Sequence, residues 1–195
     1  MIFIPCFLFA QIGLKTGLNF ANVTGASSIN SSSRTGFLVG AFLAPKSKGV
    51  LGFRTELIYS KQGYNYKTNT NTGNVNLDYI LLPQMTTISI TKYFQIQIGG
   101  QMAFLLNAKA DSSNGSGSSG YGKLLDFYNK FDYGIAGGIE IHPVKGLLIG
   151  ARYNLSLGSL YNTSASNDGT NQSFIPEVDA KNNVVNIFIG WRFGK

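Results

Sequence analysis

The stretch FDYGIAGGIEIHPVKGLLIGARYNLSLG, residues 131–158, contains two alternating runs that meet at a turn, residues 142–146. Apolar residues recur at every second position: Phe131, Tyr133, Ile135, Ile139 and Ile141, then Leu147, Ile149, Ala151, Tyr153, Leu155 and Leu157. A period of two predicts two antiparallel strands. The intervening positions hold small or polar residues and single charges, among them Glu140 and Arg152. This combination is typical of a membrane β-barrel, in which lipid contacts the apolar face and the polar face lines the interior.

Six further segments show the same alternation, which gives eight predicted strands in all. They are residues 11–20, 34–44, 50–62, 75–90, 94–106 and 184–193. The connections after the second, fourth and sixth strands are short, whereas residues 22–33, 63–74, 107–130 and 159–183 form long polar connections. Bacterial outer-membrane barrels have an even number of strands, short periplasmic turns and long external loops. The sequence therefore predicts an all-β fold, an eight-stranded antiparallel up-and-down transmembrane β-barrel with periplasmic termini.

The predicted fourth strand is the least regular of the eight. Leu77, Tyr79 and Leu81 alternate with Asp78, which predicts lipid-facing apolar side chains and an interior Asp78. Pro83 cannot donate a backbone hydrogen bond, so we expect a bulge or a locally unpaired edge there.

The first ten residues differ from the rest of the chain. Residues 1–10 are short, apolar and end in Phe-Ala, as the hydrophobic region and cleavage site of a secretory signal peptide do. The alternative is a first buried strand, against which Pro5 and the lack of alternation both count. We expect residues 1–10 to be a signal-peptide remnant and residues 11–195 to be the barrel domain. Cys6, the single cysteine, lies in the remnant, so the mature chain would have no disulfide.

The composition excludes several classes of protein. The net charge is +7, but Lys46, Lys48, Lys92 and Lys145 are scattered over short turns and no basic run with interleaved aromatics occurs. Nucleic-acid binding is therefore not expected. No run of 18 apolar residues is available for a transmembrane helix.

Several segments together resemble the PorT-type "porin family" outer-membrane β-barrel domain. They are GLKTGLNFANVTG, TELIYSKQGYNY, LDYILLPQM, FDYGIAGGIEI, IGARYNLSLG and the ending NIFIGWRFGK. The likeness covers essentially the whole mature chain and rests on the ordered set of motifs. It implies an eight-stranded barrel related in architecture to small OmpA/OmpX-type proteins, and it implies no catalytic residues. The end departs from the pattern, because Gly194 and Lys195 follow Phe193 where such barrels end on an aromatic residue.

Motifs that suggest other chemistry lie in the connections. Residues 115–120 match G-x-G-x-x-G and residues 117–123 match G-x-x-x-x-G-K, but the flanking segments are alternating strands rather than a parallel strand and a helix. Residues 167–171 lack the terminal Glu of a calcium loop. The only histidine is His142, so a His-based metal cluster is not expected. Residues 124–128 are an apolar patch and a candidate partner contact.

Charged residues on the small, polar face form the one constellation of interest. We expect Lys15, Arg54, Glu56, Asp78, Glu140, Arg152 and Arg192 to point into the barrel. They could line a pore or ligand site, or they could neutralise one another. An eight-stranded barrel has room for little more than side chains, and buried charges need partners. Both signs are present, which favours a filled interior.

These observations predict a non-enzymatic outer-membrane protein that presents long external loops and binds no cofactor. Outer-membrane lipid is the expected surrounding, the barrel is expected to be a monomer, and a protein partner could bind the loops. One alternative is a narrow porin or a transport- or secretion-associated component. The other, a soluble ligand-binding barrel of lipocalin type, would need an apolar interior and a polar exterior.

Overall fold

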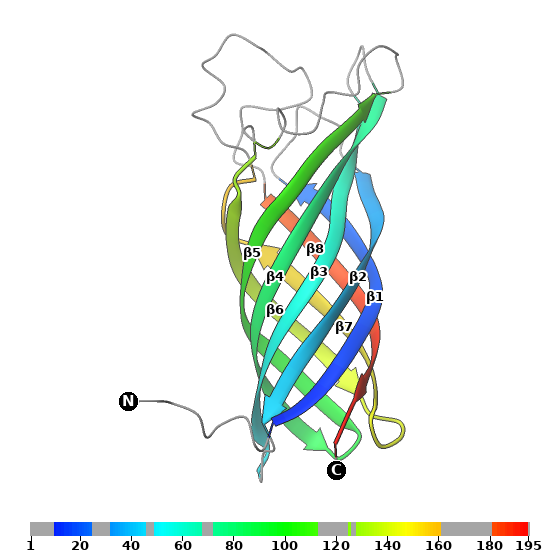
Figure 1. Cartoon of the computed structure of the whole chain (residues 1–195), viewed down its shortest axis with the longest axis vertical. Coiled ribbons are helices and arrows are strands. Elements are labelled where there is room, and N and C mark those ends of the chain that lie inside the picture. The colour runs from blue at the N-terminus through cyan, green and yellow to red at the C-terminus, as the bar shows by residue number, and fades with distance from the viewer. Residues whose placement is uncertain are drawn as a thin grey trace, which may run out of the picture.

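The protein forms one closed, eight-stranded antiparallel barrel in which β1 also pairs with β8 (Figure 1). The computed structural model describes residues 10–24, 32–45, 49–67, 72–112, 125, 128–160 and 181–194. The strands are β1 (Ala10–Thr24), β2 (Ser32–Pro45), β3 (Leu51–Lys67), β4 (Thr72–Thr91), β5 (Phe94–Ser112), β6 (Phe131–Ile141), β7 (Leu147–Ser156) and β8 (Lys181–Arg192). The predicted fold class is confirmed. No helix among these residues is long and apolar enough to cross a bilayer.

The two ends of the barrel differ in their connections. The start of β1, the end of β8 and the β6–β7 turn lie at one end, here called the turn end, and the strand ends that flank the long connections lie at the other, the loop end (Figure 1). The connection from β6 to β7 closes at Gly146, whose φ of 93° favours glycine. A side chain there would also meet the Trp191 ring, with the added Cβ 3.0 Å from that ring.

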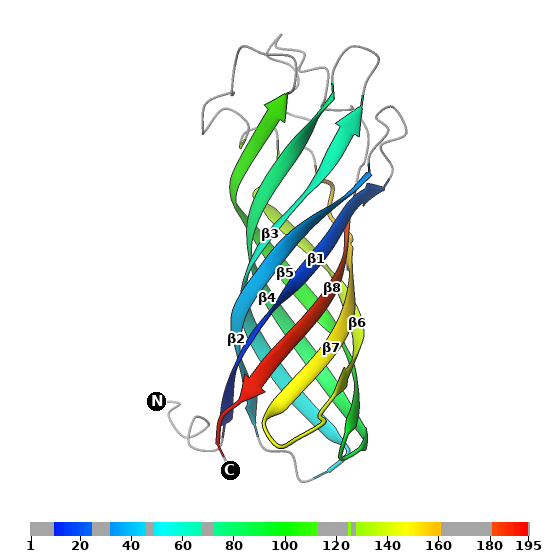
Figure 2. The same ribbon diagram turned by 90° about the vertical axis from the view of Figure 1, so that its right-hand side faces the viewer.

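Several strands are longer at the loop end than the sequence predicted. β3 continues to Lys67, β4 starts at Thr72 and β5 continues to Ser112, so much of the predicted connections 63–74 and 107–130 is strand. Figures 1 and 2 show β3, β4 and β5 rising above the other strands. The Asn- and Thr-rich segments were read as loops for their composition, yet the ladder of backbone hydrogen bonds continues through them. We call the part of these strands nearest the loop end the collar; it comprises residues 61–67 of β3, 72–78 of β4 and 107–112 of β5, which pair with one another.

The two faces of the barrel wall have opposite polarity over most of its height. Leu14, Ile135 and Ile187 are 50–54% exposed on the outer surface, whereas Glu56, Glu140 and other charged side chains are buried inside. Apolar side chains outside and charged ones inside are what a bilayer requires. This arrangement is the reverse of a soluble ligand-binding barrel, which excludes the lipocalin-type alternative.

Strand β4 contradicts the predicted orientation of its side chains. Leu77, Tyr79 and Leu81 are 0%, 2% and 4% exposed and point into the barrel. Asp78 therefore lies on the outer face, opposite Lys61 of β3 in the register, and accepts a hydrogen bond from Asn107 at 3.2 Å. Both faces of this strand contain apolar residues, so its alternation did not determine which face is the inner one.

Pro83 interrupts the pairing of β3 with β4 without shifting it. Thr55 pairs with Gln84 and Ile58 with Leu81 in one register, and the residues between them are not paired. The predicted unpaired edge is confirmed, and the bulge lies elsewhere, between β4 and β5 where Asp78 and Tyr79 meet β5.

The apolar patch predicted at residues 124–128 is not an exposed surface at Leu125 and Tyr128, the two of its residues that the structure describes. Tyr128 is only 1% exposed and Leu125 packs against the buried apolar cluster. The Tyr128 hydroxyl is 2.9 Å from the Tyr64 hydroxyl inside the collar. Tyr128 therefore belongs to the buried apolar cluster rather than to an exposed contact surface. Residues 1–9 of the predicted signal segment 1–10 lie outside the described residues, and so do the motifs at 115–123 and 167–171.

Candidate functional site: a buried charge layer and a cavity at the turn end

The centre of the interior is a layer of charged side chains that pair across the barrel. Arg54 of β3 donates two hydrogen bonds to Glu140 of β6, at 2.7 and 2.9 Å. Arg152 of β7 donates two to Glu56 of β3, at 2.8 and 2.9 Å, and Lys15 of β1 donates a third at 2.6 Å. Their side chains are at most 2% exposed. Paired two-point contacts of this kind fix both position and orientation.

Gln97 of β5 connects the two ion pairs. Its side-chain amide donates to Glu140 at 2.7 Å and its carbonyl accepts from Arg152 at 2.6 Å. We refer to Lys15, Arg54, Glu56, Gln97, Glu140 and Arg152 as the charge layer. Three basic side chains therefore face two carboxylates.

Two aromatic rings pack against the cations of the layer. Phe42 lies 4.6 Å from the Arg54 guanidinium, and Phe188 lies 4.3 Å from the Lys15 ammonium and 5.5 Å from the Arg152 guanidinium. Such cation–π contacts are strongest in a desolvated setting. A Cβ at Gly13 would overlap the Phe42 ring, so that glycine makes room for the aromatic residue.

Polar amides form a second layer nearer the loop end. Asn19 donates to Ser60 at 2.7 Å and accepts from Asn186 at 2.6 Å. Asn182 donates to Gln62 at 2.6 Å. A cavity beside this layer holds only about 20 Å³, about the space of one water molecule. Side chains thus fill the interior at two levels.

The structure brings together five of the seven predicted interior charges: Lys15, Arg54, Glu56, Glu140 and Arg152. Arg192 points inward but stays 3.9 Å from Glu140, and Asp78 lies outside the barrel. Sequence reasoning missed the bridging role of Gln97, although it lies on the correct face. It also missed His142, whose Nε2 is 3.0 Å from Glu140, because a residue after a strand end has no alternation to follow.

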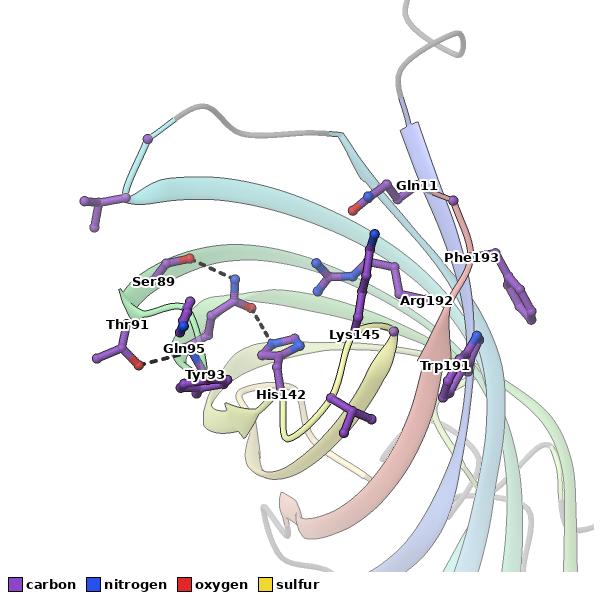
Figure 3. A pocket seen from close by; sticks show the side chains of 16 residues that line it. Gln11, Ser89, Thr91, Tyr93, Gln95, His142, Lys145, Trp191, Arg192 and Phe193 are labelled. Carbon is purple, nitrogen blue, oxygen red and sulfur yellow. Dashed lines mark hydrogen bonds between the residues drawn. The ribbon is translucent and has the colours of Figure 1, made fainter.

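Below the charge layer, the barrel opens into a cavity of about 920 Å³ at the turn end. Figure 3 shows Lys145, Arg192, His142 and Gln95 around this space. Its lining includes Lys92 as well and contains no Asp or Glu. His142 hydrogen-bonds Gln95, at 3.2 Å, as well as Glu140. The cavity is therefore lined by basic side chains and is linked to the charge layer through His142.

The site offers little for catalysis or metal binding. Within the described ranges, no group of three His, Cys, Asp or Glu side chains could hold a metal ion. Both glutamates of the charge layer are fully used by cations, so neither is placed to transfer a proton to a substrate.

A lipid-facing apolar wall around a paired, charged interior defines an outer-membrane β-barrel. The family model "Outer membrane protein beta-barrel domain" matches residues 8–162. The chain belongs to this family, and its location is the outer membrane. No curated protein matches the chain.

Solved structures show the same fold at low sequence identity. The chain is similar to Ail, the attachment invasion locus protein of Yersinia pestis, with 15% identity, a TM-score of 0.51 and coverage of 94% of this chain and 99% of that one. The structure of Ail in complex with the heparin analogue sucrose octasulfate has 14% identity to this chain and a TM-score of 0.54, with the same coverage. Neisserial surface protein A has 13% identity and a TM-score of 0.54, with coverage of 94% of this chain and 99% of that one. These likenesses support the fold alone.

Proposed function

We propose that the protein is a non-enzymatic, monomeric outer-membrane barrel that presents its long connections to an external partner and does not conduct solutes. The charge layer carries the proposal. It spans the interior from β1 through β3 and β5 to β6 and β7, and its glutamates are 0% exposed. Displacing these side chains to open a path would leave buried charges without partners, which costs several kcal/mol for each ion.

The loop end is built as a support for the long connections. Val75, Leu77 and Tyr64 fill the collar from inside, and Tyr128 and Leu160, which flank the long connections, are buried against them. The Asn129 backbone N–H donates to the Leu160 carbonyl at 3.0 Å, which ties the two connections together. A rigid base under long surface segments suits a protein that binds through those segments.

The charge at the loop end does not favour a polyanionic ligand there. Ail binds a heparin analogue in its structure, but that property does not follow from the shared fold. In this sequence, the acidic and basic residues in or next to the long connections are equal in number. They are Asp78, Asp111, Asp126, Asp132, Asp168, Glu177 and Asp179 against Arg34, Lys61, Lys67, Lys109, Lys123, Lys130 and Lys181. A partner of mixed charge, such as a protein, fits this balance better.

The second candidate is a narrow porin or a secretion-associated component, as the PorT-type resemblance would suggest. The cavity at the turn end favours it, because the cavity extends to His142, which lies 3.0 Å from Glu140 of the charge layer.

Solute permeability separates the two candidates. Liposomes containing the refolded protein should swell in arabinose or glycine no faster than protein-free liposomes. As a positive control, a wide porin reconstituted at the same density should swell rapidly. Swelling above the protein-free rate by the folded, heat-modifiable form would contradict the proposal and favour the porin.

A further inference from the structure

We propose that the cavity at the turn end binds an oxyanion of the phosphate type, held by Arg192 and Lys145. The two side chains belong to different elements, β8 and the β6–β7 turn, and line the same cavity (Figure 3).

Arg192 lacks the acceptors that a partly buried guanidinium needs. Its side chain is 23% exposed, and the nearest carboxylate oxygen, on Glu140, is 3.9 Å away. Its Nε is buried and has no hydrogen-bond partner among the described residues. Leaving a buried donor without an acceptor is unfavourable, so a ligand that supplies acceptors would be favoured.

Glu140 cannot move to serve Arg192, because its acceptor positions are already occupied. One oxygen accepts from Arg54 at 2.9 Å and lies 3.0 Å from His142 Nε2. The other accepts from Arg54 and from Gln97, both at 2.7 Å. A carboxylate offers about four lone-pair sites, so none remains for Arg192.

The surroundings reinforce the positive character of the cavity. Lys145 is exposed and has no acceptor in the part of the chain that the structure describes. The three short connections and the last three residues contain no Asp or Glu. An ammonium beside a guanidinium is a suitable pair for phosphate oxygens.

The phosphate could come from two sources that meet this end of the barrel, the headgroup of an anionic phospholipid or a soluble phosphate compound. Trp191, the only tryptophan in the chain, lines the cavity and provides a reporter. Pyrophosphate would be titrated into the protein in phosphatidylcholine nanodiscs while Trp191 fluorescence is followed. In parallel, native mass spectrometry would compare retained phosphatidylglycerol with phosphatidylcholine.

Saturable pyrophosphate binding would support the proposal with a soluble source, and preferential retention of phosphatidylglycerol would support it with a lipid source. In either assay, Arg192→Gln and Lys145→Gln should each weaken binding about tenfold, the loss expected for one charge-assisted contact. Lys67→Gln, which removes an exposed cation at the loop end, should leave it unchanged. If Arg192→Gln does not fold, Lys145→Gln in an exposed turn carries the test. Absence of both ligands from the wild-type protein, or equal binding by wild type and variants, would overturn the proposal.

Discussion

Strands β3, β4 and β5 run through both the collar and the part of the barrel below it, here called the lower barrel. The polarity of their outer and inner faces is reversed between these two regions. In the lower barrel, β3 directs Leu57 outward and Arg54 and Glu56 inward. In the collar, the same strand directs Lys61 outward and Tyr64 inward, with Tyr64 0% exposed. The reversal occurs without any change in the twofold alternation of the strand.

The difference shows that the medium around the barrel, lipid or water, determines whether the outer face is apolar or polar. Where lipid surrounds the barrel, the outer face is apolar, and the charged side chains inside pair with one another and pack against buried apolar residues such as Phe42 and Phe188. Where the wall extends beyond the lipid, polar side chains meet water and the apolar ones form a core, as in a soluble protein. The charge layer and the apolar side chains inside the collar both fill the interior of the barrel, each in the surroundings that suit it.

Removing one charge from the layer should have the largest effect. Glu140→Gln would remove the two-point partner of the buried Arg54 guanidinium and leave it only Glu56, 3.8 Å away, as a counter-charge, which should cost about 3–5 kcal/mol of unfolding free energy. Reversible urea unfolding in lipid vesicles measures this loss. Lys67→Gln serves as the control, since its side chain is exposed. A variant within about 0.5 kcal/mol of wild type, the range of an ordinary surface change, would show that water reaches the layer.

Truncating an apolar side chain should cost more inside the collar than on the lipid face. Leu77→Ala, at a position 0% exposed, should lose about 2–5 kcal/mol because a cavity remains. Leu57→Ala, at a position 54% exposed to lipid, should lose about 1–2 kcal/mol less because lipid tails refill the space. The same unfolding assay gives both values. Equal losses would mean that β4 faces the other way.

The hydrogen bond that ties the long connection to the collar should have the smallest effect. Tyr64→Phe removes one partner of the Tyr64–Tyr128 pair and should cost about 1 kcal/mol. Protease added from outside should also cut the connection after β5 faster in this variant. Tyr153→Phe, on the lipid face, is the matched control. Unchanged stability and cleavage in Tyr64→Phe would show that the contact does not hold the connection.

The eight strands could be predicted because strand alternation is a local property of the sequence. The pairing inside the barrel could be predicted only in outline. Glu56 and Arg152 were placed on one face, but which carboxylate meets which cation depends on register and closure, which alternation does not encode. Gln97 and Phe42 interact with the charges only because the barrel brings distant strands together.

Most of the errors share one physical cause, whereas the inward orientation of Leu81, below the collar, was missed because both faces of β4 are apolar there. The sequence was interpreted as if one medium surrounded each strand along its whole length. Leu77 and Asp78 lie in the collar, where the outer medium is water, so their predicted faces were reversed. The extent of β3 and β5 was underestimated for the same reason, since Asn-rich segments are compatible with strands that water surrounds.

The central claim is that the interior charges pair with each other and close the barrel, and a double-mutant cycle tests it most directly. Glu56→Gln, Arg152→Met and the double variant would be unfolded by urea in lipid vesicles. Each single change should be strongly destabilising, and the double should lose about 1–3 kcal/mol less than the sum. The double variant no longer buries Glu56 or Arg152 without the other, while Lys15 loses Glu56 in both the Glu56→Gln and the double variant. Small and strictly additive losses would contradict the account, because the two side chains would then face water in an open lumen.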